Sequence, residues 1–171
     1  YSLVSAGSSR DGGVGCLLSN TIAEFTKVTI TNNTAVAMGG GLHVQGNATV
    51  LMKASVVSHN DALYGGGVSL RGASLALEAG TAVHSNSVVG GDGGGLYVAE
   101  GGAVQTRNTT IEKNTATSAI GTNTFGRGGG LAIAERDRLA AAAVSPSAAA
   151  AAPAAAAAVH DLQVTTRVHL L

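Results

Sequence analysis

The sequence has no tryptophan, and only three tyrosines and two phenylalanines occur among its 171 residues. Large aromatic side chains therefore cannot fill a wide hydrophobic interior. Small and β-branched side chains must form the core instead. Such side chains suit a narrow interior in which similar layers stack on one another, and this composition argues against an ordinary globular core.

The chain also lacks an excess of charge of either sign. Lysine and arginine together number 10, and so do aspartate and glutamate. There is no basic surplus to neutralise the phosphates of a nucleic acid or the head groups of an anionic membrane. We therefore expect no nucleic-acid partner.

Cysteine is nearly absent, since Cys16 is the only one. The chain can form no internal disulfide and has no metal cluster of the cysteine type. A free cysteine usually behaves as a small hydrophobic residue, so we expect Cys16 to be a buried, reduced thiol. His59 and His84 would lie on successive repeats, but two ligands make a poor metal site. The sequence thus predicts surface histidines, no metal and no cofactor, and no glycine run precedes a Lys-Ser or Lys-Thr pair as in a phosphate loop.

What the sequence does contain is a repeat that opens with glycines and closes with an asparagine. The glycine triplets at Gly39, Gly65 and Gly93 each begin a unit whose asparagine lies 21 positions later. Gly12 stands at the same distance before Asn33, and a further triplet opens at Gly128. A constant period of this kind is typical of stacked repeat architectures.

Apolar residues alternate after each triplet, as in a short strand with one buried face. Leu42 and Val44, for example, flank His43, which we expect to point outward together with its equivalents Ser69 and Tyr97. Two more short strands follow in each unit. Three short strands per unit cannot bury a face alone, so like strands must stack. The sequence predicts an all-β, right-handed parallel β-helix of about five coils.

The fixed asparagine of each unit would form a column along one corner of this β-helix. Amide side chains stacked in a column can satisfy each other and the polar groups of the turn. We expect a structural turn column rather than the alternative of a polar binding stripe, made of Asn33, Asn60, Asn86 and Asn114.

The repeats resemble those of the polymorphic outer membrane proteins, surface autotransporters whose motifs are GGA followed by Ile, Leu or Val, and Phe-x-x-Asn. Residues 101–104 read GGAV, and four glycine triplets are similar with glycine in place of alanine. Ile, Val, Val and Ile stand three residues before the four asparagines, where the family has phenylalanine. The resemblance covers about residues 12–133 and implies a right-handed β-helical passenger; the family's membrane-embedded barrel has no counterpart in this sequence.

The organisation along the chain follows from these patterns. Residues 1–11 are expected to end a preceding coil and turn, and 12–138 to form the β-helix coils. Residues 139–159 are almost all alanine with two prolines, which predicts a low-complexity insertion in the last coil and no membrane span. Alternation returns in 160–171, where a strand of the last coil would resume.

Many β-helices are polysaccharide lyases or hydrolases, and these enzymes need two or three acids that converge on one strand face. Glu78, Glu100 and Glu112 fall in three different columns of the repeat, so no pair converges. We therefore expect a non-catalytic structural or adhesin-like module of a larger protein. The alternatives are a carbohydrate-active β-helix enzyme of the pectate-lyase type and a scaffold subunit of a large intracellular assembly.

The expected partners are other protein subunits or adjacent coils of the same parent chain, with glycans as a further candidate. The expected location is extracellular or at the cell surface. Three N-x-Ser/Thr sequons provide candidate N-glycosylation sites at Asn32, Asn47 and Asn108.

Overall fold

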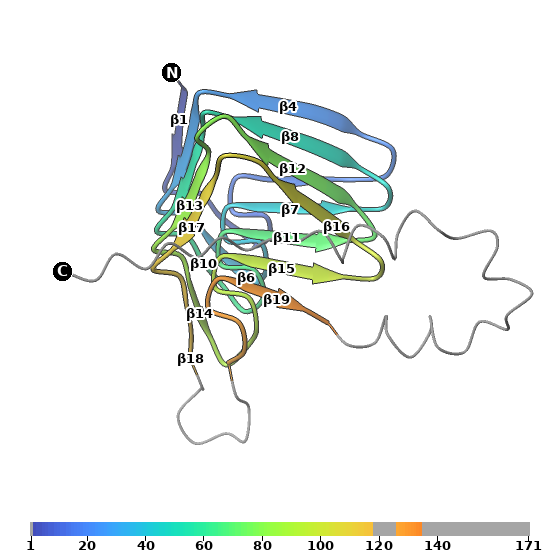
Figure 1. Cartoon of the computed structure of the whole chain (residues 1–171). Helices are drawn as coiled ribbons and strands as arrows, with labels where there is room; N and C mark the ends of the chain where they lie inside the picture. The colour runs from blue at the N-terminus through green and yellow to red at the C-terminus, as the bar shows by residue number, and fades with distance from the viewer. Residues whose placement is uncertain (1, 118–125, 135–171) are drawn as a thin grey trace, which may run out of the picture.

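A computed structural model describes residues 2–117 and 126–134, and these residues form one parallel β-solenoid (Figure 1). Every strand pairing is parallel, and strands of successive turns lie side by side in four sheets. The described chain makes about four turns, after which three strands begin a fifth. The expected all-β parallel β-helix is thus confirmed. The alanine-rich segment and the strand expected after it lie outside the described residues.

Each turn contributes one strand to each sheet, in the order sheet 1, 2, 3 and 4. Sheet 1 contains β1 (Ser2–Ser5), β5 (Val28–Thr31), β9 (Val56–Ser58), β13 (Ala82–His84) and β17 (Thr110–Glu112). Sheet 2 contains β2 (Ser8–Asp11), β6 (Thr34–Met38), β10 (Asp61–Ala62), β14 (Ser87–Val89) and β18 (Thr115–Thr117). Sheet 3 contains β3 (Gly15–Leu17), β7 (Leu42–Gln45), β11 (Val68–Arg71), β15 (Leu96–Ala99) and β19 (Leu131–Ile133). Sheet 4 contains β4 (Ile22–Thr26), β8 (Thr49–Lys53), β12 (Ser74–Glu78) and β16 (Ala103–Thr106).

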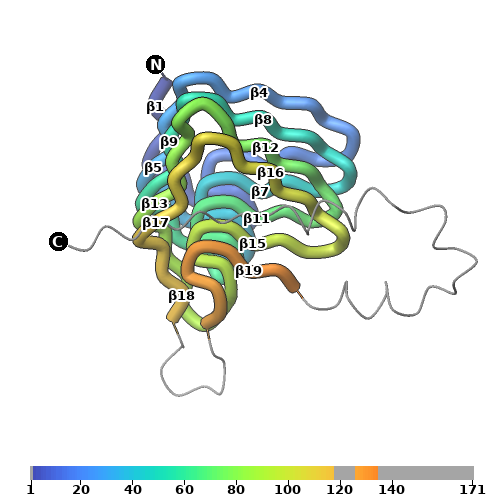
Figure 2. Tube along the Cα trace, viewed as in Figure 1, coloured from blue at the N-terminus to red at the C-terminus, as the bar shows by residue number. Residues whose placement is uncertain are grey.

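The turns stack closely on one another (Figure 2). The core inside them is a narrow stack of mainly aliphatic side chains. In sheet 3, for instance, Leu42, Val68 and Leu96 are in register and almost completely buried. Equivalent columns run through the other sheets. Because each turn buries only a few such side chains, the core grows by the addition of nearly identical layers, as the scarcity of aromatic residues predicts.

The prediction of three strands per turn is wrong, because each turn has four. The additional strands make up sheet 2, and they lie between each asparagine and the next glycine triplet. β10 has only two residues, and the pairing of β2 with β6 shifts register between Ser9 and Asp11. Because these strands are short and their connections differ in length, the sequence shows no clear alternation of apolar and polar residues that would reveal them.

The corner asparagines stack at the boundary between sheets 1 and 2. Oδ1 of Asn60 accepts hydrogen bonds from the backbone nitrogen of Asn33 at 3.0 Å and from Nδ2 of Asn33 at 2.9 Å. Asn86 and Asn114 continue this pattern with the same geometry. In the first turn Gly7 takes the place of the asparagine, and its nitrogen donates to Asn33. Every layer is therefore linked to the next by amide side chains in the protein interior.

The glycine triplets make room for this close stacking. A Cβ atom added to Gly66 would lie 2.3 Å from the carbonyl oxygen of Ser87 and 2.5 Å from that of Gly94. Gly65, the first glycine of the same triplet, has a φ of +64°, which side chains disfavour. The backbone can bend here and still approach the neighbouring turn only because these positions carry no side chain.

A second buried polar column, which the sequence analysis missed, lies at the corner between sheets 4 and 1. Oγ of Ser55 donates to the carbonyl oxygens of Phe25 and Lys53 and accepts from the nitrogen of Val28. Thr81 occupies the same place one turn later and is fully buried. The signal in the sequence is a hydroxyl residue directly before β9, β13 and β17, namely Ser55, Thr81 and Thr109, which is easily taken for an ordinary turn residue.

Replacing Asn60 with alanine tests the asparagine column. The substitution leaves the nitrogen of Asn33 and the carbonyl oxygen of Ile30 without their partners in a buried corner. We expect the free energy of unfolding to fall by about 2–4 kcal/mol, measured by urea denaturation. Gln105→Ala, which removes an exposed amide side chain, is the matched control and should change stability by less than about 0.5 kcal/mol. Equal effects of the two substitutions would show that the column does not stabilise the fold.

Candidate functional site

The outer face of sheet 3 carries a row of side chains that differ from turn to turn. Five residues occupy equivalent positions on neighbouring strands: Cys16, His43, Ser69, Tyr97 and Ala132. We call this the sheet-3 row. The row contains a thiol, an imidazole, a hydroxyl and a phenol, which makes it a candidate for a functional site.

The residues that precede the glycine triplets border the sheet-3 row. Isolated bridges pair Met38 with Tyr64 and Asp92 with Arg127. The ring centroid of Tyr64 lies 5.1 Å from that of Tyr97, with the rings tilted by 44°. The border therefore contacts the row across turns, and the row is partly covered rather than open along its whole length.

The expectation that His43 and Ser69 point into solvent is wrong. Their exposed fractions are 3% and 0%, although both lie on the outer face of sheet 3. Alternation correctly assigns them to that face, but it cannot show that another segment lies over it. Within the part of the chain that the structure describes, Nδ1 of His43 and Oγ of Ser69 have no hydrogen-bond partner.

Burial lowers the pKa of His43, because a charged imidazolium would lose its hydration. The hydrogen bond between Nε2 and Oε1 of Gln45, at 3.3 Å, and the nearby Asp11 carboxylate oppose this effect. The positive charge of the Arg71 guanidinium lowers the pKa of His43 further. The net shift is downward, so His43 is a neutral ring in the folded protein.

Cys16 is exposed, which contradicts the expectation of a buried thiol. Cys16 lies on the outer face of β3, which is exposed at this position, whereas the equivalent position on β7, His43, is buried. Partial burial and the neighbouring Asp11 carboxylate both raise the pKa of the thiol. The group is therefore protonated at neutral pH and is a weak nucleophile.

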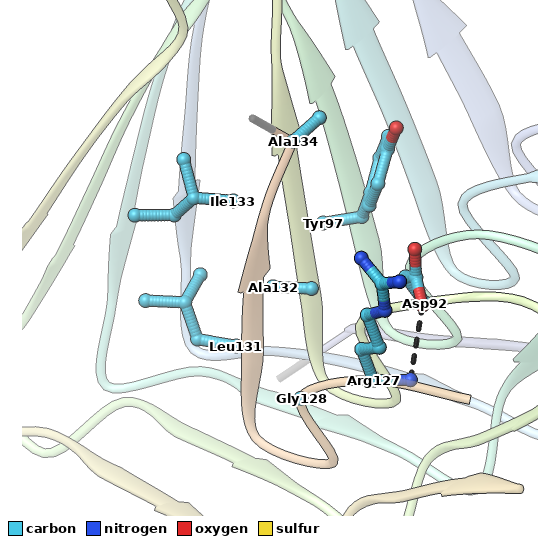
Figure 3. Close-up of a pocket in the computed structure, with 8 residues that line it drawn as sticks. All are labelled: Asp92, Tyr97, Arg127, Gly128, Leu131, Ala132, Ile133 and Ala134. Carbon is cyan, nitrogen blue, oxygen red and sulfur yellow. Dashed lines mark hydrogen bonds between the residues drawn. The ribbon is translucent and has the colours of Figure 1, made fainter. Parts of the chain in front are cut away.

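A pocket of about 480 Å³ opens at the end of the sheet-3 row that lies on β15 and β19 (Figure 3). Its lining residues are Asp92, Tyr97, Arg127, Gly128, Leu131, Ala132, Ile133 and Ala134. The backbone nitrogen of Arg127 donates a hydrogen bond of 2.9 Å to Oδ1 of Asp92. The pocket thus combines an aromatic ring, a cation and a carboxylate, and sequence reasoning did not find it because its residues come from separate turns.

The other ionisable residues considered in the sequence lie apart from this pocket. Glu78 ends β12 in sheet 4 and Glu112 ends β17 in sheet 1. Glu100 follows β15 and forms an ion pair with Arg71. They occupy three separate places on the coil, in agreement with the separate columns seen in the sequence.

The two histidines on successive turns do approach each other. The rings of His59 and His84 are 5.8 Å apart and nearly perpendicular. His59 is exposed, as expected, whereas His84 is half-buried. Across residues 2–117 and 126–134, no group of three or more His, Cys, Asp or Glu side chains is placed to hold a metal ion. Nor does any helix in these residues have the length and apolar character needed to cross a membrane.

The three sequons lie on turns at the solvent-exposed surface. Asn32, Asn47 and Asn108 are exposed and have φ angles of 55°, 61° and 50°. The threonines that complete the sequons, Thr34, Thr49 and Thr110, are exposed as well.

An exposed apolar row on sheet 2 was also missed. Val36, Leu63 and Val89 are 75%, 38% and 57% exposed, and their neighbours pair in register across β6, β10 and β14. We call this the sheet-2 row. The short strands of sheet 2 show no clear alternation in the sequence, so the three side chains cannot be aligned from the sequence.

The family-model comparison agrees with this architecture. Residues 8–138 match the model described as a right-handed β-helix region. The chain belongs to the right-handed β-helix family. No curated protein and no solved structure gives a match to it. The family is therefore established at the level of the β-helix, and the resemblance to polymorphic outer membrane proteins is not resolved further.

The buried imidazole of His43 predicts a pH-dependent stability. Because burial lowers the pKa of His43 in the folded protein, the unfolded chain takes up a proton on this ring at a higher pH, near 6.5, than the folded chain does. The free energy of unfolding should therefore fall as the pH drops below this value. We expect His43→Gln to reduce that slope in urea denaturation at a series of pH values, and His59→Gln to retain it because His43 is still present. An unchanged slope in His43→Gln would contradict the assignment.

Proposed function

We propose that this right-handed β-helix is a non-catalytic structural or adhesin-like module of a larger surface or extracellular protein. In this role the stacked turns form a stiff support, and their outer rows contact proteins or glycans. The observation that carries the proposal is the contrast between the two sides of the sheets. Inside, nearly identical layers are joined by buried amides; outside, equivalent positions differ from turn to turn.

The arrangement of acids supports a non-catalytic role. Glycan hydrolysis by a general acid and a second carboxylate requires the two groups to face the same glycosidic bond. Glu78, Glu100 and Glu112 lie in different sheets or turns, and Glu100 is engaged by Arg71. Asp92, in the pocket, accepts a hydrogen bond from the backbone nitrogen of Arg127 and has no second carboxylate among the other residues that line the pocket.

The exposed rows support a role in contacts. The sheet-2 row places three aliphatic side chains in line on the surface, at the strand spacing of about 4.8 Å. Exposed apolar side chains that form a contiguous group mark contact surfaces more often than isolated ones do. The sequons occupy exposed turns, which is compatible with passage through a secretory pathway.

Incubation with acidic and neutral polysaccharides tests the absence of catalysis. We expect neither unsaturated products nor new reducing ends above the level of a heat-denatured sample. A polysaccharide lyase of β-helical fold serves as the positive control for the assay. Product formation that increases in proportion to the concentration of folded protein would overturn the proposal in favour of a carbohydrate-active enzyme.

Secretion from a eukaryotic cell tests the proposed location. We expect N-glycans at Asn47 and Asn108, because both asparagines and their threonines are exposed, and at Asn32 for the same reason. Mass spectrometry after enzymatic release of the glycans, which converts occupied asparagines to aspartates, would identify the sites. Thr49→Ala, Thr110→Ala and Thr34→Ala are the site-specific controls. Efficient secretion with all three sites empty would favour the intracellular scaffold.

A further inference from the structure

The pocket beside Tyr97 exists because the sheet-3 row changes from a large to a small residue. Tyr97 on β15 is in register with Ala132 on β19, so the space below the tyrosine ring is not filled by the next side chain. Gly128 and Ala134 add little volume on either side of it. The result is a hollow with an aromatic wall beside β19, the last described strand of sheet 3 (Figure 3).

The aromatic wall is held in place from behind. The Tyr64 ring packs against Tyr97 at a centroid distance of 5.1 Å, in a tilted arrangement. Both rings are half-buried. Tyr97 therefore presents a fixed ring to the pocket, and binding against it loses little side-chain entropy.

Two opposite charges stand at the rim of the same pocket. Arg127 is exposed, and its backbone nitrogen is tied to the Asp92 carboxylate by the 2.9 Å hydrogen bond. This bond and the backbone bridge between the two residues fix the carboxylate next to the arginine. A carboxylate has about four lone-pair positions, so Asp92 retains the capacity to accept hydrogen bonds from a ligand.

These groups together select for a particular ligand chemistry. An aromatic face packs well against the C–H face of a sugar ring, a guanidinium binds a carboxylate through two parallel hydrogen bonds, and a carboxylate accepts from vicinal hydroxyls. A neutral sugar would form no ion pair with Arg127. A dianionic phosphate would be repelled by Asp92. A ligand with one carboxylate and several hydroxyls can pair its carboxylate with Arg127 and donate hydrogen bonds from its hydroxyls to Asp92.

We propose that this pocket binds a carboxylated sugar residue of an acidic glycan. The sugar ring packs on Tyr97, its carboxylate pairs with Arg127, and its hydroxyls donate to Asp92. A volume of about 480 Å³ lies within the range of small-ligand sites. This inference rests on the proposed role in glycan contact and identifies the class of glycan.

Titration calorimetry of the full chain tests the inference, with a glucuronate-containing disaccharide as the probe and its neutral glucose counterpart as the comparison. We expect the acidic disaccharide to bind at least about tenfold more tightly than the neutral one, since a charged hydrogen-bonded pair contributes this much. Arg127→Gln should abolish that difference. Arg107→Gln, which alters another exposed arginine, should preserve it.

Two further variants test the other contacts. Asp92→Asn should weaken binding of both disaccharides, because its amide replaces one acceptor oxygen with a donor. Tyr97→Leu should also weaken binding of both disaccharides. This result is interpretable when the unfolding curve of the variant matches that of the parent chain. Asp92→Asn supplies the test of the pocket if Tyr97→Leu is unstable.

The possible results separate this inference from the proposed function. Equal binding of the two disaccharides, unchanged binding in Arg127→Gln, or tighter binding of inorganic phosphate or of an acidic peptide would overturn the pocket assignment and leave the structural module in place. Binding of the acidic disaccharide that is accompanied by its cleavage would overturn the non-catalytic role and keep the pocket.

Discussion

The architecture depends on a hydrogen bond that each turn makes to the next through a corner asparagine. The side-chain oxygen of one asparagine accepts from both the backbone and the side chain of its neighbour one turn earlier, as Asn60 does from Asn33. An amide can do this at every layer because its oxygen accepts two hydrogen bonds while its nitrogen donates. If a turn shifted by one residue, its asparagine would leave the column and its apolar residues would exchange faces. The interaction therefore sets the register of the whole stack.

The glycines before sheet 3 follow from the same requirement. Neighbouring turns lie so close at this corner that the carbonyl groups of adjacent turns occupy the space of a side chain, as at Gly66. The described interior is mainly aliphatic, and its residues stack in columns such as that of Leu42, Val68 and Leu96. The outer positions vary in polarity and charge from turn to turn. Within the described residues, the outer rows are therefore the surfaces on which turns differ chemically.

Among those rows, the outer face of sheet 3 departs most from simple repetition. Its middle part is covered, so that His43 and Ser69 are buried polar groups on the outside of a sheet. Its end is open beside Tyr97, where Arg127 and Asp92 meet at the rim of a pocket. Between these two parts, the Tyr64 ring, which stands directly before a glycine triplet, packs against Tyr97.

The sequence by itself determined the repeat, the direction of stacking and the corner column, because a constant distance between glycine and asparagine is a local pattern that only stacked turns can satisfy. It also placed Leu42 and Val44 on the buried face of their strand. Only the tertiary structure decided that each turn has four strands, that Cys16 is exposed while His43 is buried, and that Tyr97 and Arg127 share a pocket. The physical reason is that these properties depend on which segments of different turns lie over one another. Alternation along one strand gives the face of a residue, but not what covers that face.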